Sequence, residues 1–179
     1  MEDFKNAIED AIRQENWLAA LSLSLSVPDI CGGIDDPLKK SGFRYARWFD
    51  TWFHFRQSNQ ILAGNDCYAL RCALTHEGRD VTLFQRAKKA IDKFHFVKPP
   101  NDGSTPYVTE IGGGFYIPVD MFASEMCAAL SRWLSSKSKD VDAQERMGNL
   151  IKIHQPTEHI GGGKLTYPSF GMTGTISAG

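Results

Sequence analysis

An arginine and a histidine five positions apart, Arg71 and His76, are the residues of this chain whose types could act together in chemistry. Arginine is always charged and holds a phosphate through a planar fork of N–H donors. Histidine can give or take a proton near neutral pH. The pair therefore suits a substrate with a phosphodiester and a proton to be moved, although an arginine and a histidine at a helix end also commonly serve as surface caps.

The pair must be positioned by an apolar helical run that the sequence predicts over residues 65–77. Residues five apart on a straight α-helix are rotated by about 140°, so Arg71 and His76 would not converge from one regular helix. Glu77 and Gly78 form a stop signal, because glycine readily adopts the left-handed conformation that ends helices. Either the helix ends between the two residues, or they act across a subunit interface.

Three segments in order along the chain carry a family resemblance: residues 25–32, 44–50 and 66–78. The last resembles the signature of the HEPN superfamily, which is an arginine followed at short spacing by a histidine, and all three resemble small bacterial HEPN-like proteins. The resemblance covers about residues 1–135. It implies a mainly α fold with a β-hairpin insertion, namely a HEPN-like helical bundle with an α+β periphery.

The resemblance also implies an activity, a metal-independent endoribonuclease that works at a homodimer cleft, often as a toxin or antiphage effector. Arg71 and His76 are the catalytic residues that it carries over. It further implies RNA as substrate and an antitoxin or a nucleotidyltransferase as candidate partner. RNA suits chemistry without a metal, because its 2′-OH is a built-in nucleophile. From proximity alone, Asp66, Thr75 and Glu77 are expected to support the site, with Asp50 as a weaker candidate.

A second interpretation stays open, a non-catalytic HEPN-like module that binds RNA, a nucleotide or a protein. Many active HEPN proteins carry a polar residue directly after the arginine, whereas this chain has Cys72. The near-neutral net charge and a hairpin-rich tail favour the same interpretation. The two alternatives are separated by whether the pure protein cleaves RNA.

The composition limits the possible functions but does not identify one. A chain of 179 residues with 42% hydrophobic and 23% charged residues is typical of one globular domain. Its net charge of −1 argues against tight non-specific DNA binding. We expect a cytoplasmic protein without a membrane span, since no apolar run approaches the length of such a span. The four cysteines lack a C-x2-C spacing, so we expect no metal and no cofactor.

Hydrophobic periodicity predicts the other elements. Helices are expected over residues 4–25 (ending before Pro28), 38–62, 83–92 and 118–136, with a loop at Cys31–Gly33. A strand over 93–98 and a hairpin around Gly112–Gly114 form the insertion near 94–118. The HEPN-like domain is expected to cover 1–140, and residues 141–179 to form a C-terminal extension with a second hairpin.

Overall fold

The structure, a computed structural model, describes residues 1–55, 61–75, 88–100, 102, 107–151, 153, 159–160 and 163–164. Its helices are α1 (Glu2–Arg13), α2 (Trp17–Asp35), α3 (Ser41–Trp52), α4 (Gly64–Thr75), α6 (Val119–Ser136) and α7 (Val141–Gly148). Its strands are β1 (Phe94–Val97), β2 (Thr109–Ile111), β3 (Gly114–Pro118), β4 (His159–Ile160) and β5 (Gly163–Lys164). Residues 88–93 are also helical. The protein is thus mainly helical with a small three-stranded sheet, as the coarse fold class predicted.

The expectation of one long N-terminal helix over 4–25 is wrong, because two helices occupy this part of the chain. Glu15 takes a positive φ of 55°, which breaks the helix after α1. Asn16 then caps α2, since its side-chain oxygen accepts a hydrogen bond from the Ala19 N–H at 3.2 Å. The expected stop before Pro28 is also wrong: Pro28 lies inside α2 and is buried there.

The loop expected at Cys31–Gly33 is the C-terminal part of α2 instead. A Cβ on Gly32 would lie 2.6 Å from the carbonyl oxygen of Arg44 on α3. This glycine therefore serves a close helix–helix approach rather than a turn. Gly64, at the start of α4, does the same on the other side, because its Cβ would lie 2.4 Å from the Ala46 oxygen. Two glycines thus let α3 pack closely between α2 and α4.

Helix α3 is shorter than the expected 38–62, whereas α4 matches the expected 65–77 over its described residues. The chain leaves α3 at Phe53, which has extended backbone. Among the aromatic residues of the range 38–62, Trp48, Phe53 and Phe55 are buried, Trp52 is half-buried, and Phe43 is 56% exposed. The expected segments 56–60 and 76–87 lie outside the described residues.

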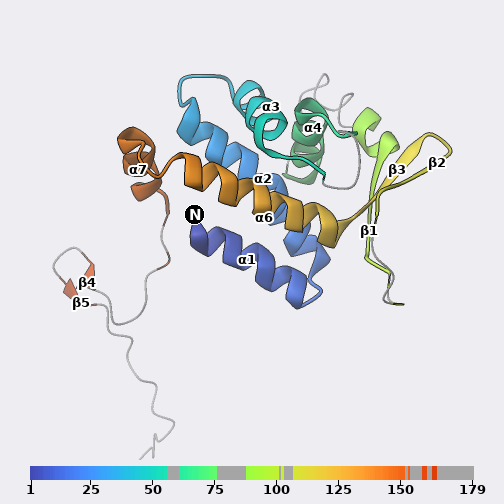
Figure 1. The fold of residues 1–179 in the computed structure, drawn as a ribbon, viewed down its shortest axis with the longest axis horizontal. Helices are drawn as coiled ribbons and strands as arrows, with labels where there is room; N and C mark the ends of the chain where they lie inside the picture. Colours follow the sequence, from blue (N-terminus) through green and yellow to red (C-terminus); the bar gives the residue numbers. More distant parts are fainter. Residues whose placement is uncertain are drawn as a thin grey trace, which may run out of the picture. The chain divides into compact units, whose positions relative to one another are not determined.

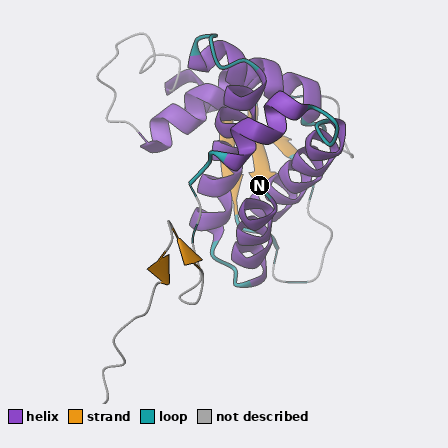
Figure 2. Ribbon diagram, turned by 90° about the vertical axis from the view of Figure 1, so that its left-hand side faces the viewer, coloured by secondary structure: helices purple, strands orange, loops and turns teal. Residues whose placement is uncertain are grey.

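The hairpin expected around Gly112 is confirmed. Strands β2 and β3 pair antiparallel, and both Gly112 (φ 61°) and Gly113 (φ 82°) adopt the left-handed conformations that tight hairpin turns require. The expected strand at 93–98 is β1, which pairs parallel with β3, so that β3 lies in the middle of the sheet. Figure 2 shows this sheet behind the helices, at one end of the bundle.

Helices α2 and α6 run through the centre of the bundle, with α1 on one side and α3 and α4 on the other (Figure 1). Helix α6 agrees with the helix expected over 118–136. The core is filled by large side chains from these helices that are fully buried, among them Ile8, Leu25, Tyr45, Trp48, Phe49, Phe122, Met126, Leu130 and Trp133. This core fixes the faces on which any site must lie.

One compact unit covers Met1–Gly148 and a second covers Asn149–Gly179. Helix α7 packs on α2 and belongs to the first unit. The domain expected from the sequence ends at residue 140. No helix was expected there. In the second unit, β4 and β5 form an antiparallel pair, in line with the second hairpin expected in the extension.

Helix α2 corrects the expectation that no apolar run reaches the length of a membrane span. Its 19 residues meet that criterion by length and composition. In this protein α2 packs against α1, α3, α4, α6 and α7 and is partly buried inside the fold. The same pattern is found in the central helix of a soluble bundle.

Candidate functional site

Arg71 lies on α4, and its guanidinium is held by a carboxylate on α2. Its Nη2 donates to Asp29 Oδ2 at 2.7 Å. The two side chains are 21% and 22% exposed, so the ion pair lies at the edge of the core. A charged hydrogen bond in such a position is shielded from solvent on most sides, which strengthens it relative to a surface pair. The pair therefore fixes where Arg71 points.

The side chains next to this pair form a polar seam between α2, α3 and α4. The Tyr45 hydroxyl donates to the Leu25 carbonyl oxygen at 2.9 Å and lies 3.3 Å from Cys67 Sγ. Complete burial raises the pKa of Tyr45 well above its usual value, Cys67 raises it further, and the positive charge of Arg71 opposes the shift. Tyr45 is thus a neutral, buried hydrogen-bonding residue of this polar seam.

Tyr68 extends the seam toward solvent. Its ring lies 5.3 Å from that of Tyr45, and its hydroxyl is 3.1 Å from Ser41 Oγ. Partial burial raises the pKa of Tyr68, Ser41 lowers it, and the buried thiol of Cys72 one turn further along α4 raises it. Cys72 therefore faces the packed interior, and the residue after Arg71 is not a polar group at the surface.

Of the supporting residues expected from proximity, the structure describes Asp66 and Thr75. The exposed Thr75 donates its hydroxyl to the Arg71 carbonyl oxygen at 2.9 Å, a bond within α4 itself. Asp66 is a half-buried acid in the first turn of α4, where its negative charge interacts favourably with the positive end of the helix dipole. No hydrogen bond or ion pair between described side chains joins Asp66 to Arg71. His76 and Glu77 lie outside the described residues.

Asp50 has a different place from the one expected. Its Oδ1 accepts the backbone N–H of Gly64 at 2.7 Å, so it secures the start of α4. Sequence reasoning missed Asp29, an acid that contacts Arg71. Its signal was present, because Asp29 is the one acidic residue between Trp17 and Ile34, in the segment that carries the resemblance.

The geometry defines what the site can do. The Arg71 guanidinium is held by a carboxylate, and about a fifth of the side chain is exposed. It is therefore preorganised to bind an oxyanion at the edge of the bundle, because it needs no reorientation when the ligand arrives. Within the described part of the chain, no three His, Cys, Asp or Glu side chains gather as metal ligands. All four cysteines are buried and free.

Comparisons with known protein families, with curated proteins and with solved structures give no match to this chain. The protein is therefore described by its structure alone. It is a mainly helical bundle with a small sheet and an arginine–aspartate pair between α2 and α4. The resemblance to HEPN proteins stays a prediction.

Proposed function

We propose that the protein is a HEPN-type, metal-independent endoribonuclease in which Arg71 and His76 act on one phosphodiester of RNA. The observation that carries the proposal is the ion pair of Arg71 with Asp29. It fixes a partly exposed guanidinium on the third turn of α4, in the helix whose last described residue, Thr75, directly precedes His76 in the chain. Arginine and histidine are the two groups that such a cleavage needs.

The bonds formed and broken and the protons transferred in this reaction can be accounted for without a metal ion. The 2′-oxygen attacks the adjacent phosphorus and forms the O2′–P bond, while the bond from phosphorus to the 5′-oxygen breaks. One histidine takes the proton of the 2′-OH, and a second proton is delivered to the leaving 5′-oxygen. Arg71 stabilises the negative charge that grows on the phosphoryl oxygens. The products are a 2′,3′-cyclic phosphate and a 5′-hydroxyl.

Two proton transfers are easier to supply from two chains than from one. Each chain offers one motif histidine, and a two-fold axis would bring both copies of Arg71 and His76 to a shared cleft. The proposal therefore includes a homodimer of about twice 20.0 kDa in solution. It further includes a cytoplasmic role as a toxin or antiphage effector, with an antitoxin or a nucleotidyltransferase as candidate partner.

The test is cleavage of mixed RNA by pure protein in EDTA, with the product ends analysed. Arg71→Ala and His76→Ala should each lower the rate by about a hundredfold or more, in the range for loss of an oxyanion donor or an acid/base group. Arg13→Ala is the matched control, because Arg13 is 70% exposed on α1. DNA of the same sequence should stay intact. Cleavage that requires added Mg²⁺, or full activity of Arg71→Ala, would contradict the mechanism.

A mixture of the two mutant chains tests the shared cleft. A mixed dimer of Arg71→Ala and His76→Ala keeps one arginine and one histidine in the cleft, so the mixture should recover part of the activity. Each pure mutant has lost both copies of one residue and serves as the control. A fully active monomer, or a mixture no better than its components, would exclude the shared cleft.

One observation favours a second candidate function, a non-catalytic HEPN-like binding module. Arg71 is committed to Asp29, and Cys72 turns to the interior, which is also what a purely structural arginine would show. Such a module would bind RNA, a nucleotide or a protein without cutting RNA. RNA binding measured by fluorescence anisotropy, together with intact RNA in the cleavage assay, would favour this candidate.

A further inference from the structure

A pocket of about 270 Å³ lies between the C-terminal end of α2, helix α3 and the end of α6, apart from Arg71. Its volume is just below the range of about 300–1,000 Å³ that is typical of small-molecule sites. Charged groups dominate the wall: Arg44, Arg47 and Lys137 as cations, with Asp35 and Asp36 as carboxylates. Trp52, which is half-buried, adds an aromatic side chain to the wall.

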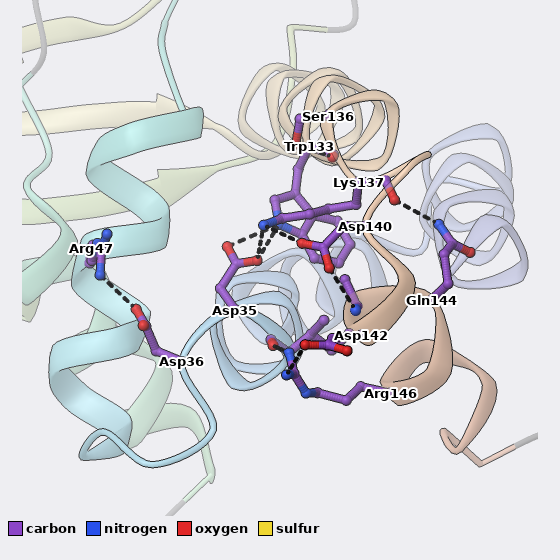
Figure 3. A network of polar contacts seen from close by, with 12 residues as sticks. Asp35, Asp36, Arg47, Trp133, Ser136, Lys137, Asp140, Asp142, Gln144 and Arg146 are labelled. Carbon is purple, nitrogen blue, oxygen red and sulfur yellow. Dashed lines mark hydrogen bonds and ion pairs between the residues drawn. The ribbon is translucent and has the colours of Figure 1, made fainter.

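Two of the three cations are already paired. Arg47 Nη1 donates to Asp36 Oδ2 at 2.9 Å, and Lys137 Nζ lies 2.9 Å from Asp35 Oδ1 (Figure 3). Asp35 also accepts the indole N–H of Trp133 on both oxygens, at 3.2 and 3.0 Å. Both carboxylates are therefore engaged, and the positive charge that remains in the wall belongs to Arg44.

The Arg44 guanidinium has no acidic or hydrogen-bonding partner among the residues that the structure describes. Its guanidinium carbon lies 3.6 Å from where a Cβ on Gly33 would be, so the guanidinium packs beside α2. Its Nε is buried and has no acceptor within the described part of the chain. An N–H donor in that state carries a desolvation cost that an added acceptor would remove.

A second donor of the same kind belongs to this wall. Trp48 is 2% exposed, and its Nε1 is likewise buried without an acceptor in the described structure. By contrast, the indole N–H of its neighbour Trp133 has the Asp35 carboxylate. A cavity whose wall combines one uncompensated cation with two donors that lack acceptors is built for an oxyanion.

We propose that this pocket binds a small molecule that bears a phosphate group, with Arg44 as the phosphate ligand and Trp52 beside its organic part. The pocket is larger than a phosphate ion alone needs, which leaves space for an organic group. A phosphate carries more charge than a carboxylate, and the lining as a whole keeps one net positive charge, at Arg44, after Arg47 and Lys137 are paired. The proposal does not depend on the ribonuclease activity, because Arg71 does not line the pocket.

Titration calorimetry of the full chain tests the proposal with four probes: inorganic phosphate, AMP, adenosine and succinate. AMP should bind at least tenfold more tightly than adenosine, and inorganic phosphate should compete with it. Arg44→Met keeps most of the side-chain volume but removes the charge, and it should weaken AMP binding at least tenfold. Arg13→Met is the control with the same change in net charge, because Arg13 lies exposed on α1, and it should bind as the wild type does.

A second variant keeps the test decisive if Arg44→Met does not fold. Thr51 is exposed and lines the pocket, so Thr51→Trp should fill the cavity and abolish binding while the circular dichroism spectrum stays native. The proposal is overturned if AMP and phosphate fail to bind the wild type at millimolar concentration, or if both pocket variants bind them normally. Tighter binding of succinate than of AMP would also overturn it. So would loss of binding to a short RNA, but not to AMP, in Arg44→Met.

Discussion

Arg71 and Asp29 lie 42 positions apart in the chain, yet their side chains meet at 2.7 Å, and this contact joins α4 to α2. Each side chain is about one-fifth exposed, so neither is a surface charge nor a fully buried one. The pair can therefore stabilise the bundle and orient Arg71 for a ligand at the same time. Thermodynamic coupling and RNA cleavage are separate measurements of these two roles.

A double-mutant cycle should detect the coupling between these two residues. Arg71→Met and Asp29→Asn should each lower the free energy of unfolding by about 1–3 kcal/mol, because each removes the partly buried ion pair that joins α4 to α2. The double variant should lose less than the sum of the two. The exposed pair Arg13–Asp10, at 70% and 51%, is the control, with a coupling of about 0.5 kcal/mol or less. Equal coupling in both cycles would contradict a partly shielded pair.

The two glycines that face α3 should not tolerate a methyl group. Gly64→Ala and Gly32→Ala would place a Cβ 2.4 and 2.6 Å from backbone oxygens, so the helices must move apart. We expect each to destabilise the protein by about 2–3 kcal/mol or more, the upper range for overpacking. Gly148→Ala is the matched control, because its Cβ would have no neighbour within 4 Å. Chemical denaturation that gives Gly64→Ala wild-type stability would contradict the close approach.

Stability should fall as the pH rises above about 9. Burial raises the pKa of Cys67 to about 12 and that of Cys127 to about 11, whereas the value without burial is 9.0. Between these values the unfolded chain loses thiol protons that the folded chain keeps. The unfolded state is then favoured by up to about 1.4 kcal/mol per pH unit for each thiol.

Thermal unfolding at pH 8, 9 and 10 measures this slope. Cys67→Ala should make it shallower, since one buried thiol is removed. A thiol reagent gives an independent check: the native protein should react slowly, and all four cysteines should react in guanidinium. Stability that rises between pH 8 and 10, or rapid reaction of Cys67 in the native state, would contradict the burial of its thiol.

The two core tryptophans should differ in what their indole N–H groups contribute. Trp133→Phe removes the donor to the Asp35 carboxylate and should cost about 1.5–3 kcal/mol for that bond, in addition to lost packing. Trp48→Phe loses a similar volume, but its Nε1 has no acceptor in the described structure, so it should cost less. Urea denaturation compares the two variants directly. An equal loss would mean that the bond to Asp35 contributes little.

Local patterns predicted those parts of the fold that local forces determine. The apolar period of α6 and the paired glycines of the β2–β3 turn act over a few residues, and both elements were correctly placed. The prediction failed where packing overrides local preference. Pro28 lies inside α2, and so does Gly32, whose missing side chain lets α3 approach closely. No pattern within α2 itself reveals that approach.

The candidate site shows the same limit. Arg71 was identified from its motif, but its partner Asp29 comes from a distant helix, and a contact across 42 positions leaves no periodic signal in one sequence. Asp66 was expected to help because it is near in sequence; it lies in the first turn of α4. The pocket around Arg44 was not foreseen, because its charged residues come from α2, α3 and α6 and meet only in the folded chain.

The closeness of α3 to both of its neighbours has a consequence for recognising distant relatives of this protein. Side chains on the surface of a bundle can drift, but a backbone that touches another backbone leaves room for hydrogen alone. Any divergent chain that keeps these helix–helix distances must keep glycine where Gly32 and Gly64 stand. Two glycines that bracket an aromatic helix would then be a more enduring ancestral signature than an arginine and a histidine, which can be lost together when an activity is abandoned.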